Sequence, residues 1–466
     1  MTDLFAARSQ MAMSLGFHII FAAVGVALPL LMVIAEALWL KTKDETYRTL
    51  AQQWAKGTAI LFAVGAVSGT VLSFELGLLW PRFMDFAGAI IGLPFALEGF
   101  AFFVEAIFLG IYLYGWQRVP PAWHLFAGIM VSLAGAASAI FVVSVNGWMN
   151  MPVGFRFEGG KAVDIDPVVA MFNPAWVPEA IHMTLAAYAA TAFAVAGVHA
   201  FLLQRNRDNL FHRHALAIAL VVGGISAILL PLSGDLNARK LAQQQPRKLA
   251  ALEGQFKTEK GAPLRIGGLP NEKTQETPYA LEIPYGLSLL GFHDPHAEVK
   301  GLEEWPKADH PPVAVVHVPF QIMVACGAAM AAVGVATLIL AWRNRHRRGR
   351  WSLPDQTWFL RTLVLAAPLG FIAIEAGWTV TEVGRQPFII AWIMRTAEAV
   401  TPVPHLTIPL ITFTLVYLFL AFVIVVLLLR QFRQSPRIMR DRASDISVGE
   451  SAAESTKPRI MLDDNE

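Results

Sequence analysis

Nine long apolar stretches alternate with polar segments along the chain. They lie at about 13–40, 57–79, 91–115, 123–147, 179–203, 214–233, 317–342, 358–381 and 407–430. A bilayer core about 30 Å thick is crossed by roughly 20 apolar residues in a helix, and these stretches reach or nearly reach that length. Because backbone groups cannot remain unpaired in lipid, each stretch is predicted to be a helix. The pattern therefore predicts an all-α integral membrane protein with nine transmembrane helices.

Basic residues gather on one side of the predicted helices. They concentrate in 41–56, 204–213, 343–350 and the segment after 430, which follow the first, fifth, seventh and ninth stretches. Short basic loops face the cytoplasm, so we expect the N-terminus outside and the C-terminus in the cytoplasm. The first stretch is long enough to span and lacks a small-residue cleavage site, which favours a membrane helix over a signal peptide.

The same pattern divides the chain into four regions. We expect six helices in 1–233, an outer segment at 234–316, three helices in 317–430 and a cytoplasmic tail at 431–466. The outer segment is too long for a simple connection, so it is expected to be functional. The tail is polar and is predicted to be disordered.

Composition limits the possible chemistry. Of 466 residues, 15% are charged and 55% hydrophobic, with a mean hydropathy of +0.50 and a net charge of +2. This nearly neutral net charge does not indicate a surface that binds nucleic acid. The single cysteine, Cys326, excludes an internal disulfide, a four-cysteine iron–sulfur site and a CxxCH haem attachment. A metal would have to be held mainly by histidine, methionine or carboxylate side chains.

Ionisable side chains inside the predicted helices are costly and indicate function. They are His18, Glu75, Glu98, Glu105, His182, Glu375 and Glu382. Glu98 and Glu105 lie seven residues apart, close to two helical turns, and therefore share one helix face. Glu375 and Glu382 repeat this spacing in another helix.

The predicted topology collects ligand-type side chains in the outer half of the membrane. His18, Glu98, His182, Met323 and Glu382 all fall there, although they come from separate helices. Taken singly, a histidine at an interface or a methionine in a core has a simple packing explanation. Taken together, imidazole and thioether ligands suit a low-spin haem, and buried glutamates can carry protons. The set predicts redox chemistry.

Several strings go beyond composition and resemble a known family. They are GFH at 16–18, ALEGFAFFVEAIFLGIYLYGW at 96–116, NGWM at 146–149, IMVACG at 322–327 and EAGWTVTEVGRQPF at 375–388. Together they resemble subunit I of the cytochrome bd-type quinol oxidases, over residues 1 to about 430. The comparatively short outer segment is similar to the short-loop, cyanide-insensitive branch of that family.

The resemblance implies a set of haem-binding residues. His182 and Met323 would be the axial ligands of low-spin haem b558. His18 and Glu382 would each ligate one of two high-spin haems, b595 and d, in an order that stays open. Two further residues, Trp378 and Arg385, would contact the haems, with the Arg385 guanidinium paired to a propionate.

The resemblance also implies routes for protons and quinol. Glu98 would face the haem site where oxygen reacts, and Glu105 with Ser138 would line the proton path. Lys248 and Glu253 of segment 234–316 would bind quinol oxygens and accept protons.

Two positions depart from the usual family pattern. Gln321 stands where many members have arginine, beside the low-spin haem, and Phe388 stands where tryptophan is usual. Losing the arginine charge should lower the haem potential or change propionate pairing. Some members of the short-loop branch use haem b in place of haem d, so both remain open for the oxygen site.

The implied protein is a quinol:oxygen oxidoreductase that generates a membrane potential without pumping protons. It would oxidise ubiquinol or menaquinol outside and reduce oxygen with cytoplasmic protons. Its expected partners are subunit II, often with a small single-span subunit, and membrane lipid. The alternatives are a proton-coupled transporter without haem, another membrane cytochrome and a haem-binding scaffold without oxidase activity. The haem–copper and bc-type proteins need more paired histidines than this chain offers.

Overall fold

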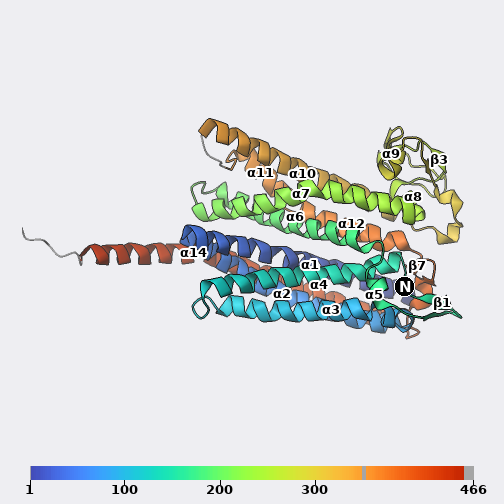
Figure 1. The fold of residues 1–466 in the computed structure, drawn as a ribbon, viewed down its shortest axis with the longest axis horizontal. Helices are drawn as coiled ribbons and strands as arrows, with labels where there is room; N and C mark the ends of the chain where they lie inside the picture. The colour runs from blue at the N-terminus through green and yellow to red at the C-terminus, as the bar shows by residue number, and fades with distance from the viewer. Residues whose placement is uncertain (1, 349–352, 456–466) are drawn as a thin grey trace, which may run out of the picture. The chain divides into compact units, whose positions relative to one another are not determined.

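The structure is a computed structural model that describes residues 2–348 and 353–455. Within these ranges, nine helical segments are long and apolar enough to cross a membrane (Figure 1). They are α1 (Asp3–Thr42), α2 (Glu45–Leu79), α3 (Pro81–Tyr114), α4 (Pro121–Asn150), α6 (Trp176–Leu203), α7 (Leu210–Gln244), α10 (Val313–Arg348), α11 with α12 (Thr357–Ala366 and Leu369–Arg385), and α14 (Thr407–Ser455). The predicted all-α fold with nine membrane helices is confirmed, and the orientation of the termini stays a prediction.

Several helices extend beyond the apolar stretches that predicted them. α1 begins at Asp3, where the Thr2 hydroxyl accepts a hydrogen bond from the Phe5 amide at 3.3 Å and caps the helix. α7 continues past 233 to Gln244, and an ion pair between Asp235 and Arg239, one turn apart, lies in this polar extension. Hydropathy locates the membrane core of a helix, whereas caps and side-chain pairs decide where the helix ends.

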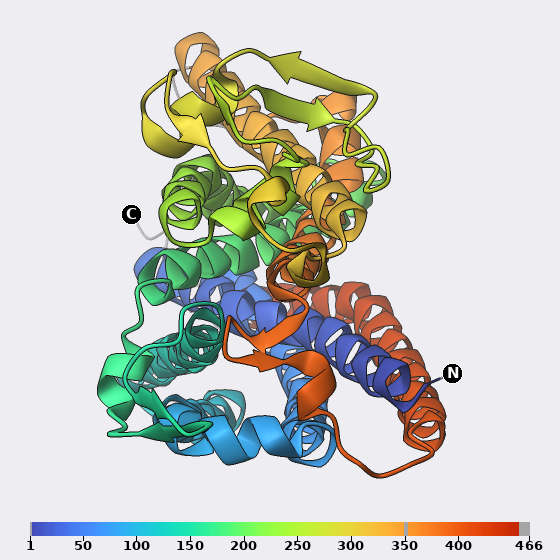
Figure 2. The same ribbon diagram turned by 90° about the vertical axis from the view of Figure 1, so that its right-hand side faces the viewer.

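The part of the chain from Met1 to Thr414 forms one compact unit. In it α1 packs against α2, α4 and α6, and α6 packs against α7, α11 and α12. Figure 2 shows α1 between the α2–α4 group and the α6–α7–α10 group. Alanine is frequent along α6, and small side chains allow helices in a membrane to approach closely. These contacts set the positions of the helices around the site.

The eighth membrane segment is broken rather than continuous. α11 ends at Ala366 and α12 begins at Leu369, with Pro368 between them. Proline has no amide hydrogen and cannot continue the helical hydrogen-bond ladder. The break lies against Gly197 of α6, where a Cβ atom would run into the Ala367 methyl group.

Short elements cover one end of the bundle. The segment between α4 and α6 contains the hairpin β1–β2 (Arg156–Glu158, Lys161–Val163) and α5 (Pro167–Met171). The segment between α7 and α10 contains α8 (Pro246–Glu253), β3 (Glu259–Lys260), β4 (Leu264–Gly267), β5 (Ala280–Ile283), α9 (Gly286–Phe292), β6 (Glu298–Val299), η1 (Leu302–Glu304) and η2 (Lys307–Asp309). After α12 come β7 (Phe388–Ile390), β8 (Met394–Arg395) and α13 (Thr396–Ala399). The strands pair antiparallel as β3–β6, β4–β5 and β7–β8.

The region boundaries differ in detail from the prediction. The outer segment expected at 234–316 lies between the helix ends Gln244 and Val313. For the tail after 431 the sequence predicts disorder, whereas α14 continues to Ser455, and residues 456–466 lie outside the described residues. The four-region division itself stays a prediction.

The contact at the α11–α12 break leads to a first prediction. In Gly197→Ala the new methyl group must displace Ala367 and lies 3.0 Å from the Leu363 carbonyl oxygen. We expect a loss of about 1–3 kcal/mol of stability, because overpacking a tight interface costs that much. Thermal unfolding of the solubilised protein measures it. Gly110→Ala on α3, where a Cβ meets nothing within 4 Å, is the control. Equal melting temperatures for the two variants would contradict the tight packing.

Candidate functional site

A cavity of about 1320 Å³ lies inside the helical bundle. A pocket for one small molecule usually has roughly 300–1,000 Å³, so this cavity has room for more than one cofactor. Its wall is contributed mainly by α1–α4, α6–α8, α10 and α12. All twelve candidate residues line it: His18, Glu98, Glu105, Ser138, His182, Lys248, Glu253, Gln321, Met323, Trp378, Glu382 and Arg385. The fold therefore brings together residues that are up to 367 positions apart in the sequence.

Two candidate histidines share the same local arrangement. Nδ1 of His18 lies 2.9 Å from the Ser68 hydroxyl, and Nδ1 of His182 lies 2.8 Å from the Ser233 hydroxyl. Each serine donates its own proton to a carbonyl of its helix, and so accepts from the imidazole. Nε2 of both rings has no hydrogen bond among the described residues. A metal-binding histidine typically has this pattern, with one nitrogen oriented by a partner and the other free for the metal.

Glycines allow the candidate ligands to lie close to the backbone of neighbouring helices. A Cβ on Gly69 would lie 3.0 Å from Cε1 of His18, and a Cβ on Gly377 would lie 3.0 Å from Sδ of Met323. A Cβ on Gly234 of α7 would lie 3.6 Å from Cε1 of His182, which is an ordinary contact distance. Larger side chains at the first two positions would press against the ligands.

Glu382 is held by two neighbours. Asn146 donates from Nδ2 to one carboxylate oxygen, and Arg385 donates from Nη2 to the other at 2.6 Å. Arg385 is only 3% exposed, yet its Nε and Nη1 atoms have no partner among the described residues. Unpaired buried guanidinium donors are costly and fit an anionic group such as a carboxylate. On the same helix, Glu375 also has a buried oxygen, Oε1, without a partner.

The paired glutamates of α3 face α4. The Ser138 hydroxyl donates to Glu98 at 3.3 Å, so its contact is with Glu98, whereas the resemblance groups Ser138 with Glu105. The Glu105 carboxyl carbon lies 3.3 Å from the Cβ position of Gly135, and Glu105 is 5% exposed. The two carboxyl groups therefore line one wall of the cavity, as the seven-residue spacing predicts.

Lys248 and Glu253 lie on α8, at the end of the cavity formed by the outer segment. The Lys248 ammonium donates to Oδ1 of Asn150 at 3.2 Å and to the Thr381 carbonyl at 3.3 Å. Burial lowers the pKa of Lys248 to about 8, although the nearby Glu179 carboxylate opposes the shift. Burial raises the pKa of Glu253 to about 7, opposed by Arg265, and its Oε2 has no partner among the described residues. Both groups can therefore exchange protons near neutral pH.

Gln321 makes contacts that the sequence does not reveal. Its Oε1 accepts from the Gly267 amide at 3.0 Å, and its Nε2 donates to the Arg265 carbonyl at 3.1 Å. Both ends of the amide are used to hold β4, while the residue also lines the cavity. The expected proximity of Gln321 to a haem stays a prediction.

Sequence reasoning missed several residues of the site. Ser68 and Ser233 orient the histidines, Asn146 binds Glu382, and Glu179 lies close enough to Lys248 for a strong charge interaction. Only Asn146 had a signal, because it lies within the NGWM string. A serine in a membrane helix is too common to be singled out without its tertiary neighbour.

The donor set fits haem better than a bare ion. Among the residues that the structure describes, no group of three or more His, Cys, Asp or Glu side chains could hold a metal ion. A haem supplies four ligands of its own and needs only one or two from the protein. Single histidines with a free Nε2, a methionine and an unpaired arginine beside a large apolar cavity meet that need.

This fold and site define a class: helical membrane proteins whose bundle encloses large planar redox cofactors. Residues 6–436 match the family model of cytochrome bd terminal oxidase subunit I, and the chain belongs to that family. Membership makes it part of a terminal oxidase, a membrane oxidoreductase of the respiratory chain, and implies haem cofactors and a second subunit. The resemblance seen in the sequence is confirmed.

Individual relatives cover nearly the whole chain. The putative cytochrome bd menaquinol oxidase subunit I of Bacillus subtilis (strain 168) is 39% identical over 94% of this chain and 98% of its own. The cytochrome bd ubiquinol oxidase subunit 1 of the same organism is 32% identical over 96% and 97%. The structure of bd oxidase from Geobacillus thermodenitrificans is similar with a TM-score of 0.86 and 40% identity, over 93% of this chain and 99% of the other.

Proposed function

We propose that this chain oxidises quinol at the outer end of the bundle and provides the haem sites for oxygen reduction. The observation that carries the proposal is that all twelve candidate residues line one cavity. The proposal is supported by relatives whose names specify menaquinol or ubiquinol oxidases. Because these names differ, both quinols remain candidates here. A haem-free transporter would leave the serine-oriented histidines and the unpaired Arg385 donors without a role.

The haem ligands follow from the donor set. His182 and Met323 would hold low-spin haem b558, and His18 and Glu382 would each hold one high-spin haem. Arg385 would bind a propionate with its unpaired donors. When bound, the low-spin haem would pass electrons from quinol to a high-spin pair, of b595 with d or a second b, where oxygen becomes water.

The chain's own residues would handle the protons. Glu253 would accept a proton from the quinol hydroxyl, and the Lys248 ammonium would donate to the quinol oxygen as charge develops there. Glu105 and Glu98 would deliver protons from the cytoplasmic side to the oxygen site, with Ser138 holding Glu98. Protons released outside and taken up inside would build a membrane potential without pumping. Subunit II, a small single-span subunit and lipid would complete the enzyme in the bacterial inner membrane.

The proposal is tested by absorption spectra of the solubilised complex. A dithionite-reduced minus air-oxidised spectrum, with pyridine haemochromogen extraction, should give low-spin and high-spin b bands. A further far-red band would assign haem d to the oxygen site, and its absence would assign haem b there. A folded complex with subunit II that contains no haem would refute the proposal.

Replacing one axial ligand should change one haem. In Met323→Leu the thioether is lost while the side-chain volume is kept, so the low-spin haem should become five-coordinate and its sharp reduced b band should disappear. Met84→Leu on α3 is the matched control and should keep the band, because Met84 packs against a hydrophobic core and is not among the residues that line the cavity. A low-spin spectrum that survives Met323→Leu would remove Met323 from the ligand set.

The pKa of Glu253 gives a pH prediction. Only the ionised carboxylate can accept a proton, and burial raises its pKa to about 7. Quinol oxidation (kcat/KM) should therefore fall about tenfold per pH unit below pH 7. Glu253→Gln should lower the rate at pH 8 about a hundredfold, a typical contribution of a general base. It should also remove the dependence of kcat/KM on pH below pH 7, the acid limb of the pH profile. The control is Glu298→Gln, an exposed position on β6. An unchanged pH profile in Glu253→Gln would assign the limb to another group.

A further inference from the structure

His317 of α10 is a buried histidine that the proposed mechanism does not use. Its side chain is fully buried, with 0% exposure. Nδ1 lies 2.6 Å from the carbonyl oxygen of Leu252, and Nε2 lies 3.0 Å from the carbonyl oxygen of Gly267. These two acceptors belong to different parts of the outer segment, the last turn of α8 and the end of β4. One ring therefore connects three segments of the chain.

Both contacts require the ring to donate a hydrogen bond. A carbonyl oxygen only accepts hydrogen bonds, and a neutral imidazole has a single N–H group. Both bonds form together only when both ring nitrogens carry a proton. The Leu252 carbonyl lies in the last turn of α8, where carbonyls lack helical partners and carry partial negative charge. His317 therefore supplies a donor to a carbonyl that the helix itself leaves unpaired.

Gln321 acts one helical turn further along α10. Positions four residues apart share a helix face, so His317 and Gln321 face the outer segment together. The amide of Gln321 binds the Gly267 amide and the Arg265 carbonyl. The backbone of β4 from 265 to 267 is thus held by both side chains, and Gly267 is held at both its amide and its carbonyl.

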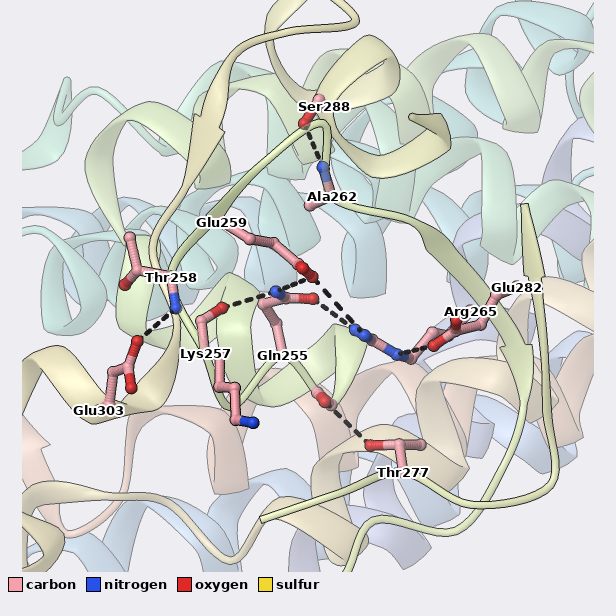
Figure 3. Close-up of polar contacts among 11 residues, drawn as sticks. Gln255, Lys257, Thr258, Glu259, Ala262, Arg265, Thr277, Glu282, Ser288 and Glu303 are labelled. Atoms are coloured by element: carbon pink, nitrogen blue, oxygen red, sulfur yellow. Dashed lines mark hydrogen bonds and ion pairs between the residues drawn. The ribbon is translucent and has the colours of Figure 1, made fainter. Parts of the chain in front are cut away.

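A second network carries this anchoring on to α8. Figure 3 shows the Arg265 guanidinium between Gln255 and Glu282. Its Nη1 donates to the Gln255 side chain, and its Nε donates to Glu282 at 3.0 Å. Gln255 follows two residues after Glu253. α10 therefore holds the backbone of Arg265 and of Leu252, the residue before Glu253. The Arg265 side chain adds a link between β4 and Gln255.

We propose that His317 and Gln321 form a clasp that positions the quinol-facing end of α8 on the helix carrying Met323. The clasp consists of these two side chains and their four bonds to Leu252, Arg265 and Gly267. Its role in catalysis rests on the proposed function, in which Glu253 accepts a proton from quinol. The two side chains are positioning residues, because they bind backbone groups of the segments that carry Glu253 and Arg265.

Loss of the clasp has a defined consequence. Without His317 the Leu252 carbonyl has no donor, and the last turn of α8 can move. Quinol must then order this turn when it binds, which weakens binding more than it slows the bound enzyme. His317 binds carbonyls of the outer segment, and the proposed ligand Met323 lies six residues further along α10, so the haem spectra should not change. The expected signature is a higher KM with a nearly unchanged kcat.

The test uses the complete oxidase and compares His317→Phe with wild type. Phenylalanine keeps a ring at the site but donates no hydrogen bond. We expect backbone amides in peptides covering 248–267 to exchange with deuterium at least tenfold faster. The KM for quinol should rise about tenfold, with less than a twofold change in kcat and an unchanged reduced spectrum.

Two further variants make the result specific. His310→Phe is the matched control, because His310 donates to the Trp305 carbonyl in the same outer segment at 2.9 Å and makes no bond to α8 or β4. It should leave exchange and KM unchanged. Gln321→Glu keeps the acceptor for Gly267 and loses the donor for Arg265, whereas Gln321→Leu loses both, so exchange should increase in that order. This graded pair tests the clasp even if His317→Phe fails to fold.

The outcomes separate the clasp from the proposed function. Exchange and KM equal to wild type in His317→Phe and Gln321→Leu would overturn the clasp. A fall in kcat with an unchanged KM would overturn its positioning role. Faster exchange in a complex whose wild type fails to oxidise any quinol would support the clasp as an anchor and refute the proposed function instead.

Discussion

The structure depends on one constraint, the need of every polar group inside a membrane bundle to find a partner within the protein. The backbone meets it by forming helices. The side chains meet it in pairs: His18 with Ser68, His182 with Ser233, and Glu382 with Asn146 and Arg385. Each pair joins side chains from different helix turns or helices and leaves one chemical function directed into the cavity. The same hydrogen bond therefore orients a candidate ligand and provides a buried polar group with its partner.

The same constraint explains why the remaining unpaired atoms are informative. Arg385 keeps two buried donors without a partner among the described residues, although its third nitrogen binds Glu382. An unpaired buried donor costs about 1–3 kcal/mol, and more when it is charged. Unpaired buried donors are therefore expected where a bound ligand accepts their hydrogen bonds. Arg385 is only 3% exposed, so little water competes with an anionic group for these donors.

The sequence predicts the parts of this protein that have strong local signals. In the part of the chain that the structure describes, apolar length locates the nine helices that could cross a membrane, and the seven-residue spacing of Glu98 and Glu105 places both on one wall. Other features depend on contacts between distant segments and have no local signal. The break before Leu369 packs closely against Gly197 of α6. The positions of β4 and α8 are held by hydrogen bonds from His317 of α10. Ser68 and Ser233 become informative only once a histidine is known to face them.

The departure at position 321 also has a physical explanation. An arginine has only donors, so it could bind the Arg265 carbonyl but could not accept a hydrogen bond from the Gly267 amide. The glutamine amide does both, at 3.1 and 3.0 Å, and adds no charge beside the Arg265 guanidinium and the His317 ring. These backbone contacts add to the hydrophobic packing of the outer segment, in which Leu252, Phe256 and Leu302 are buried against α10 and α12. Relative to the arginine that the resemblance implies for many members, Gln321 therefore exchanges a charge near the cavity for an anchor of the outer segment.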